Sequence, residues 1–152
     1  QVFTARAGFD VADWWNVGAA VSYNDLVDTD YTTYTLDTNV SFGGGLDLTA
    51  AYVATSGDAG DNWGTTVQAG YHCMDNLQGF VAYEYGELED VSENLSIATV
   101  GANYWFNDNV KWTTELGYAL NGINGAWDLG ETGWRAGDSG EYVIRTQLQL
   151  TF

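Results

Sequence analysis

The chain has 152 residues, which is enough for one domain with a sizeable core. Its 21 acidic residues against 4 basic ones give a formal net charge of −17, which argues against nucleic acid as a partner because neutralising phosphates needs a basic face. High charge can also accompany disorder, but a hydrophobic fraction of 45% with 7 Trp argues against a disordered chain.

Proline and cysteine usage narrow the class further. Proline is absent, whereas average usage of ~5% would give roughly seven or eight. Proline is excluded from central strands because it cannot donate to the sheet. The single cysteine, Cys73, permits no intrachain disulfide and no thiolate metal cluster. The longest apolar runs fall short of the ~18 residues of a membrane-spanning helix, which excludes a helical membrane protein.

Apolar and polar residues alternate in repeated segments along the whole chain and predict about nine strands. Eight of them form four hairpins: 2–9 with 16–23, 31–42 with 46–55, 63–73 with 77–88, and 95–106 with 110–121. The tight connections within these hairpins are rich in Asn, Asp and Gly, which tolerate the positive φ values of short turns. The connections between hairpins are polar and mostly acidic, over 24–30, 56–62, 89–94 and 122–140. Short turns at one end and longer polar loops at the other are typical of an outer-membrane β-barrel.

The ninth segment, EYVIRTQLQLTF (141–152), alternates most strictly. Its apolar row has an aromatic residue at each end, Tyr142 and Phe152, with aliphatic residues between them. This resembles the closing strand of bacterial outer-membrane β-barrels. An ordinary half-buried strand would alternate in the same way, so the aromatic residues of the whole chain provide an independent test.

Aromatic residues gather near the two ends of the predicted strands, and small or aliphatic residues lie between them. Two aromatic girdles around an aliphatic belt indicate two membrane–water interfaces. A soluble core would instead place its aromatic residues in the middle of the strands. The interface residues predicted in this way include Trp14, Trp15, Trp63, Trp105, Phe106, Trp112, Tyr118, Tyr142 and Phe152.

The opposite row of side chains is polar for long stretches and predicts the lining of a channel. A narrow barrel would fill its interior with these groups in one hydrogen-bonded network, whereas a wide barrel would leave them in water. The predicted channel-lining residues are Arg6, Asp37, Asn39, Glu84, Lys111, Glu115, Arg145, Gln147 and Gln149.

The number of strands is the anomaly of this pattern. Bacterial single-chain barrels have an even number of strands, whereas nine are predicted. No signal peptide precedes Gln1, so we expect either that one has been removed or that the chain is the later part of something longer. The odd count favours residues 1–152 as a single barrel segment with upstream strands missing.

Particular segments resemble a known family. GANYWFNDNVKWTTELGYALNGI (101–123), GEYVIRTQLQLTF (140–152) and DWWNVGAAVSY (13–23) resemble the C-terminal end of the phosphate-selective porin family, the O and P porins, and especially their relatives in planctomycete-like bacteria. This resemblance implies a barrel of about sixteen strands that assembles as a homotrimer. It also implies passive uptake of small solutes, sometimes anions.

Three of the four cations, Arg6, Lys111 and Arg145, fall on the inward row. A basic cluster in a pore would favour anions, and Lys111 and Arg145 lie on consecutive strands. The alternative is that each cation pairs with an inward carboxylate, for which Glu115, Glu84 and Glu141 are candidates. The arginine-rich row of a phosphate channel is not visible.

The loops carry many carboxylates, which are candidate oxygen ligands for divalent cations such as calcium. Their spacing fits no EF-hand, and a solvated rim is the favoured interpretation. They include Asp25, Asp28, Asp30, Asp58, Asp61, Glu87, Glu89, Asp90 and Glu93. In the last loop, Trp127, Trp134 and Arg135 are candidates for a constriction or for a contact with a neighbouring subunit.

His72 and Cys73 are adjacent, so their side chains point to opposite faces of the predicted strand and do not form a catalytic dyad. With no catalytic or metal motif found, we expect no enzyme, metal or cofactor.

These features predict an all-β antiparallel transmembrane barrel in the bacterial outer membrane, in contact with outer-membrane lipid. The predicted function is that of a porin for passive diffusion of small hydrophilic solutes or ions. One alternative is a complete eight-stranded barrel that acts as a non-conducting anchor or adhesin, with 2–9 outside the closure. Another is a secreted β-sandwich that binds ligands through its acidic loops.

Overall fold

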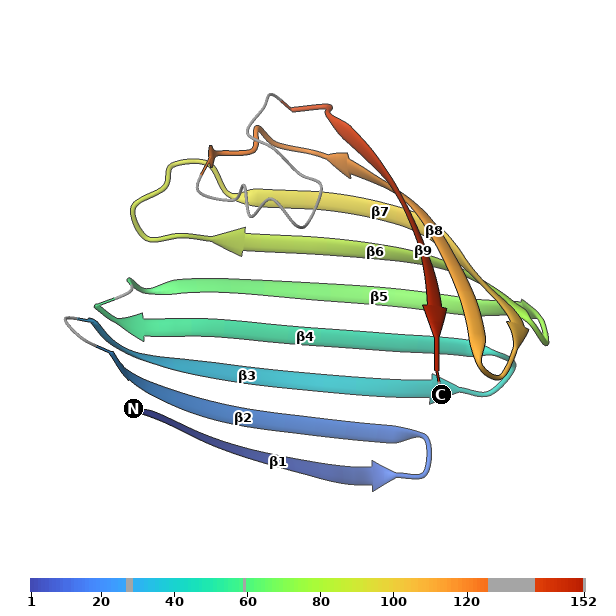
Figure 1. The fold of residues 1–152 in the computed structure, drawn as a ribbon, viewed down its shortest axis with the longest axis horizontal. Coiled ribbons are helices and arrows are strands. Elements are labelled where there is room, and N and C mark those ends of the chain that lie inside the picture. The colour runs from blue at the N-terminus through green and yellow to red at the C-terminus, as the bar shows by residue number, and fades with distance from the viewer. Residues whose placement is uncertain (27–28, 59, 126–138, 152) are drawn as a thin grey trace.

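The computed structural model describes residues 1–26, 29–58, 60–125 and 139–151. Over these ranges the chain forms nine strands and no α-helix, which confirms the all-β prediction. The strands are β1 (Val2–Ala12), β2 (Trp15–Leu26), β3 (Thr29–Phe42), β4 (Leu46–Gly57), β5 (Asn62–Met74), β6 (Leu77–Glu87), β7 (Leu95–Asn107), β8 (Val110–Ala119) and β9 (Tyr142–Leu150). Each strand pairs antiparallel with the next along the chain, so the sheet is a meander (Figure 1). No helix in these ranges is long and apolar enough to cross a membrane.

The four hairpins have the predicted partners, and most strand ends lie within a few residues of the expected positions. One connection differs. The predicted loop over 24–30 is shorter than expected, because β2 and β3 remain paired to Leu26 and Thr29. The predicted contrast between short turns and long connections therefore holds for the later connections but not for the one between β2 and β3.

The short turns all lie at one end of the sheet, on the right of Figure 1. In the turn between β3 and β4, Gly44 and Gly45 have φ values of 83° and 85°, which residues with a side chain rarely adopt. Next to the other three turns the strand pairing shifts register, as at a β-bulge. Such bulges increase the local twist of a sheet.

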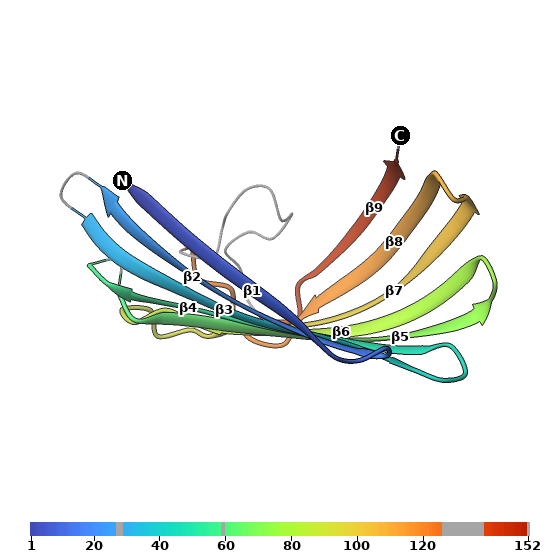
Figure 2. The same ribbon diagram turned by 90° about the horizontal axis from the view of Figure 1, so that it is seen from below.

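The sheet is a single curved layer, with β1 and β9 at its two rims (Figure 2). Within the described ranges, β1 pairs only with β2 and β9 only with β8, so the sheet is not closed. The predicted barrel segment is thus present as an open antiparallel meander, and the complete transmembrane barrel stays a prediction. The sandwich alternative required two packed sheets, whereas the described strands form one.

Cross-strand register divides the side chains into two faces. Glu84 on β6 lies opposite Thr66 on β5 and Ile97 on β7, and this row belongs to the concave face. The neighbouring residue Val81 lies opposite Ala69 and Val100, and this row belongs to the convex face. Because the side-chain period of a strand is two, each face keeps its character along the whole strand.

Few side chains are buried, because one layer of strands covers neither of its own faces. The buried apolar cluster in the part described consists of Ile97, Ala119 and Ile123, with Leu95 and Val143 packed against it. It lies on the concave side near the long connections. This cluster gives β7, β8 and β9 a local core.

Candidate functional site: the concave face

The concave face carries every residue that was predicted to line a channel. Register alone establishes this, since Gly101, Glu115 and Arg145 form one row, and Asn39 lies opposite Asn16 and Thr49. The residues placed there are Arg6, Asp37, Asn39, Glu84, Lys111, Glu115, Arg145, Gln147 and Gln149. Their shared face is an observation, whereas their role as a channel lining stays a prediction.

Arg6 on β1 forms an ion pair with Asp37 on β3, across the intervening strand β2. The guanidinium Nη2 lies 3.0 Å from Asp37 Oδ1 and 2.9 Å from Oδ2. The contact crosses β2 at Gly18, where a Cβ atom would lie 2.6 Å from the carboxylate oxygens. Glycine at this position therefore lets both side chains lie flat over the strand. The pair stays partly in solvent, with exposed side-chain fractions of 58% for Arg6 and 23% for Asp37.

Arg145 on β9 pairs with its cross-strand neighbour Glu115 on β8, with 2.5 Å between Nε and Oε1. Lys111 lies opposite Gln149, two rows nearer the short turns. Four residues separate the two rows along the strand, about 13 Å at the usual rise. Lys111 and Arg145 therefore do not form the basic cluster that was weighed for anion selectivity. For both arginines the alternative, pairing with an inward carboxylate, is the arrangement found.

A second group of polar side chains forms a chain of contacts nearer the short turns. Gln78 Nε2 lies 3.3 Å from Asp47 Oδ2 and 3.2 Å from His72 Nε2. Gln78 Oε1 accepts a hydrogen bond of 2.9 Å from Asn103, whose own amide oxygen accepts one of 2.7 Å from Thr113. This network joins β4 to β8 through side chains alone. Gln78 was not singled out from the sequence, although its alternation with Phe80 places it on this face.

Trp105 is a correction to the predicted interface aromatics. It lies on the concave face opposite Lys111, and its ring stacks on His72 with 5.6 Å between ring centres. Its neighbours Tyr104 and Phe106 belong to the convex face and contact each other there. Three consecutive strand residues do not share a face, so Trp105 does not belong with the convex aromatics.

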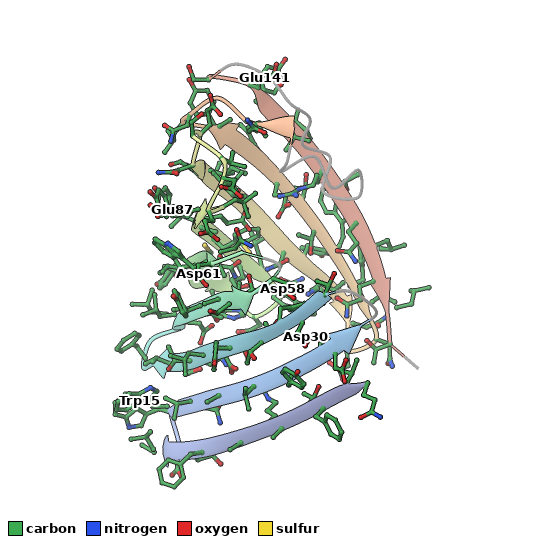
Figure 3. All side chains as sticks on the ribbon, turned by 90° about the vertical axis from the view of Figure 1, so that its left-hand side faces the viewer. Trp15, Asp30, Asp58, Asp61, Glu87 and Glu141 are labelled. Atoms are coloured by element: carbon green, nitrogen blue, oxygen red, sulfur yellow. The ribbon has the colours of Figure 1, made fainter. Side chains whose placement is uncertain are left out.

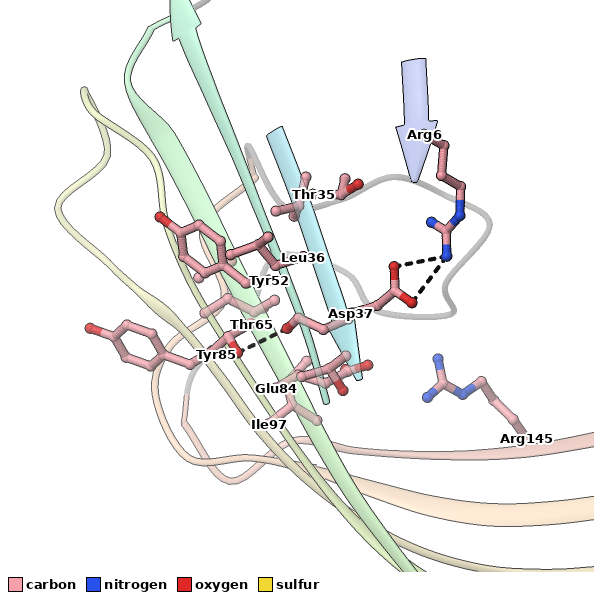
Figure 4. A pocket seen from close by; sticks show the side chains of 16 residues that line it. Arg6, Thr35, Leu36, Asp37, Tyr52, Thr65, Glu84, Tyr85, Ile97 and Arg145 are labelled. Atoms are coloured by element: carbon pink, nitrogen blue, oxygen red, sulfur yellow. Dashed lines mark hydrogen bonds and ion pairs between the residues drawn. The ribbon is translucent and has the colours of Figure 1, made fainter. Parts of the chain in front are cut away.

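The concave face is hollowed on both sides of Glu84. One cavity of about 520 Å³ lies towards the long connections, bordered by Arg6, Asp37 and Arg145. In Figure 4 these three side chains lie on one side of the strands, while Tyr52 and Tyr85 point to the other. A second cavity, of about 630 Å³, lies towards the short turns. Glu84 and Arg145 line both of them.

The convex face is apolar and exposed. Val81 and Val100, opposite each other in mid-sheet, expose 57% and 53% of their surface, and Ile144 exposes 70%. Of the predicted interface aromatics, this face carries Trp15, Trp63, Phe106, Trp112, Tyr118 and Tyr142. Trp14 lies in the turn between β1 and β2, and Phe152 lies outside the described residues. Side chains stand on both sides of the single layer (Figure 3).

The tryptophan N–H groups of this face find acceptors within the sheet. Trp15 Nε1 donates to Thr38 Oγ1 at 2.9 Å, and Trp63 Nε1 donates to Glu87 Oε2 at 3.0 Å. An indole with a satisfied N–H and an apolar ring suits a boundary between water and an apolar phase.

The carboxylates at the long-connection end hold neighbouring loops together. Asp58 Oδ2 accepts from the backbone N–H of Asp30, and Glu89 Oε2 accepts from that of Asp61, at 3.1 and 2.8 Å. In Figure 3, Asp30, Asp58 and Asp61 lie at this end of the strands. No group of three or more possible metal ligands occurs among the residues that the structure describes. Trp127, Trp134 and Arg135 lie outside them.

The loop after β6 contains one carboxylate whose pKa is shifted. A hydrogen bond of 2.9 Å from Asn124 Nδ2, and next one from Ser92, lower the pKa of Glu93. This contact joins the loop between β6 and β7 to the segment after β8.

Comparison with models of known protein families gives no match, and comparison with curated proteins gives none either. The resemblance to the phosphate-selective porins therefore rests on the strand segments alone, and the physical arrangement of the sheet carries the functional argument.

Proposed function

We propose that the chain forms wall strands of a bacterial outer-membrane porin, through which small hydrophilic solutes or ions diffuse passively. The observation that carries this proposal is the division of one sheet into an exposed apolar convex face and a polar concave face. An exposed apolar patch larger than a few hundred Å² is unusual on a soluble monomer and marks a contact with a membrane or a protein.

Lipid is the better partner for the convex face because of how its side chains are distributed. Aliphatic residues such as Val81, Val100 and Leu116 occupy mid-strand, and the tryptophans lie nearer the strand ends. A bilayer has this profile, with an apolar core between two interfaces that accept indole rings. Strands of 9 to 14 residues are also long enough for the ~9–11 residues that a tilted strand needs to cross the apolar core.

Backbone hydrogen bonding supports the same proposal. Seven strands have partners on both sides, and lipid tolerates backbone groups only when they are paired. In a membrane the outer edges of β1 and β9 would need partners as well. The concave face, with Arg6, Asp37, Glu115 and Arg145, is costly in lipid but not against water. A barrel with a water-filled interior meets both requirements, because its strands are paired on both sides and its charged side chains are hydrated.

The anchor alternative receives less support. It places residues 2–9 outside an eight-stranded closure, whereas β1 pairs with β2 from Val2 to Ala12 and β2 does not pair with β9.

Conductance tests the proposal. The protein is folded in detergent, reconstituted into a planar bilayer, and examined for single-channel current, with the reversal potential measured in a salt gradient. Discrete ohmic steps are expected. Folded protein that changes its mobility on heating but carries no current would refute the porin and favour the anchor.

A further inference from the structure

The cavity on the long-connection side of Glu84 has a floor without side chains. Val53, Gly64, Gly86 and Leu95 form one row across β4 to β7, so two glycines lie side by side between two large apolar residues. A Cβ atom added at Gly64 would meet nothing closer than 3.4 Å. The row therefore leaves a hollow with apolar walls over the half-buried Gly64, with the buried Gly86 beside it, as part of the cavity of about 520 Å³.

Of the four charged residues that line this hollow, one has no direct partner among the residues described. Arg6 is paired with Asp37, and Arg145 is paired with Glu115. Glu84 lies on the same strand as Gly86, two residues away and on the same face, and lines the hollow. Among the residues described, none forms a hydrogen bond or ion pair with the Glu84 carboxylate. The Glu84 carboxylate therefore lies beside an apolar surface without a direct partner in the described residues.

We propose that this hollow binds small organic cations, with an ammonium group at Glu84 and an apolar body over Gly64, between Val53 and Leu95. The inference deepens the proposed function and rests on it for one point, namely that such cations are solutes of the channel. An anion would meet the Glu84 carboxylate, and the two arginines beside the hollow each already face a carboxylate, Asp37 or Glu115. A bare metal ion would find one carboxylate and an apolar floor, too few oxygen ligands for calcium or magnesium.

Three probes of similar size and different charge test the site. Benzylammonium, benzyl alcohol and benzoate share an aromatic ring and are added to protein folded in a nonionic detergent, with binding measured by isothermal titration calorimetry. We expect benzylammonium to bind roughly tenfold or more tightly than benzyl alcohol, as a charge-assisted hydrogen bond provides. Benzoate is expected to bind most weakly. Equal affinity for benzoate and benzylammonium would overturn the proposal.

Two variants and a control locate the binding. Glu84→Gln keeps the shape of the side chain and removes its charge, so the preference for benzylammonium over benzyl alcohol is expected to vanish. Gly64→Val fills the hollow and is expected to weaken both probes. Asp75→Asn makes the same change of charge in the short turn between β5 and β6 and is expected to change nothing. An unchanged preference in Glu84→Gln would overturn the proposal, whether or not Gly64→Val folds.

Binding in detergent and current in a bilayer separate this inference from the proposed function. A conducting protein with no dependence of binding on Glu84 overturns the cation site and leaves the porin. A protein that binds benzylammonium through Glu84 but carries no current refutes the porin and supports the site.

Discussion

The convex and concave faces are made by alternate residues of the same strands, yet their side chains are accommodated in opposite ways. On β6, Val81 is 57% exposed on the convex face while its neighbour Phe80 is only 7% exposed on the concave face. Both residues are apolar and adjacent in sequence, yet Val81 is exposed and Phe80 is buried. Exposure is therefore not set by hydrophobicity here, as expected if the convex face contacts lipid in the way we propose.

The glycines show the same contrast. Gly101, on the concave face, lies under the ring of Phe80: an added Cβ would be 2.4 Å from that ring and 2.7 Å from the Thr114 carbonyl oxygen. Gly79, on the convex face, has nothing within 4 Å of such an atom. The concave face is thus shaped by contacts between side chains and backbone, whereas the convex face is open for the surroundings to fill.

A charge placed on each face of one strand gives the largest expected difference. Val81→Arg puts a guanidinium in the middle of the apolar convex face, and it is expected to lower the free energy of unfolding in phospholipid vesicles by about 2–4 kcal/mol. Ala82→Arg, its neighbour on the concave face, is expected to cost less than about 1 kcal/mol. Urea titration of both variants measures the difference. Equal costs would mean that the convex face does not contact lipid.

The two glycines provide the next comparison. Gly101→Ala forces the Phe80 ring and the β8 backbone apart, with an expected loss of about 1–3 kcal/mol in unfolding free energy. Gly79→Ala meets no atom and is expected to stay within about 0.5 kcal/mol of the parent. The same titration reports both values. A neutral Gly101→Ala would show that the contact between Phe80 and Gly101 does not constrain the sheet.

The cost of breaking the Arg6–Asp37 ion pair tests how far water reaches the concave face. Because both side chains are partly exposed, Asp37→Asn is expected to cost at most about 1 kcal/mol of unfolding free energy, and less in high salt. Breaking a buried pair would instead cost about 3–5 kcal/mol and be insensitive to salt. That larger cost would favour the plugged interior of the anchor alternative over a water-filled one.

The smallest expected effect is the pH dependence of the loop that holds Glu93. Asn124 favours the charged carboxylate, so the pKa of Glu93 is lower in the folded loop than in the unfolded chain. The contact therefore contributes fully above the unfolded pKa and is lost as pH falls through the folded one. NMR signals of the Asn124 side-chain amide should follow this titration, and Glu93→Gln should abolish it. A midpoint at or above the unfolded value would contradict the assignment.

Much of the fold follows from the period of the chain. Strand alternation is local and repeats in every segment, so it predicted nine strands, their hairpin partners and the shared face of the nine polar residues from Arg6 to Gln149. It was not followed for Trp105, which was assigned to one face together with the adjacent Phe106 although alternation assigns neighbours to opposite faces. It was wrong for the connection over 24–30, because polar residues such as Asn24 and Asp25 continue a strand on which one face is already polar.

By itself, the sequence determined the strands and the character of each face, because both depend on residues two apart in one segment. Only the tertiary structure decided which groups meet across strands, since that depends on register and curvature. The pairing of Arg6 with Asp37 requires Gly18 between them, and that of Arg145 with Glu115 requires the register of β8 and β9. The hollow beside Glu84 exists because Gly64 and Gly86 fall in the same row, and no local period encodes that coincidence.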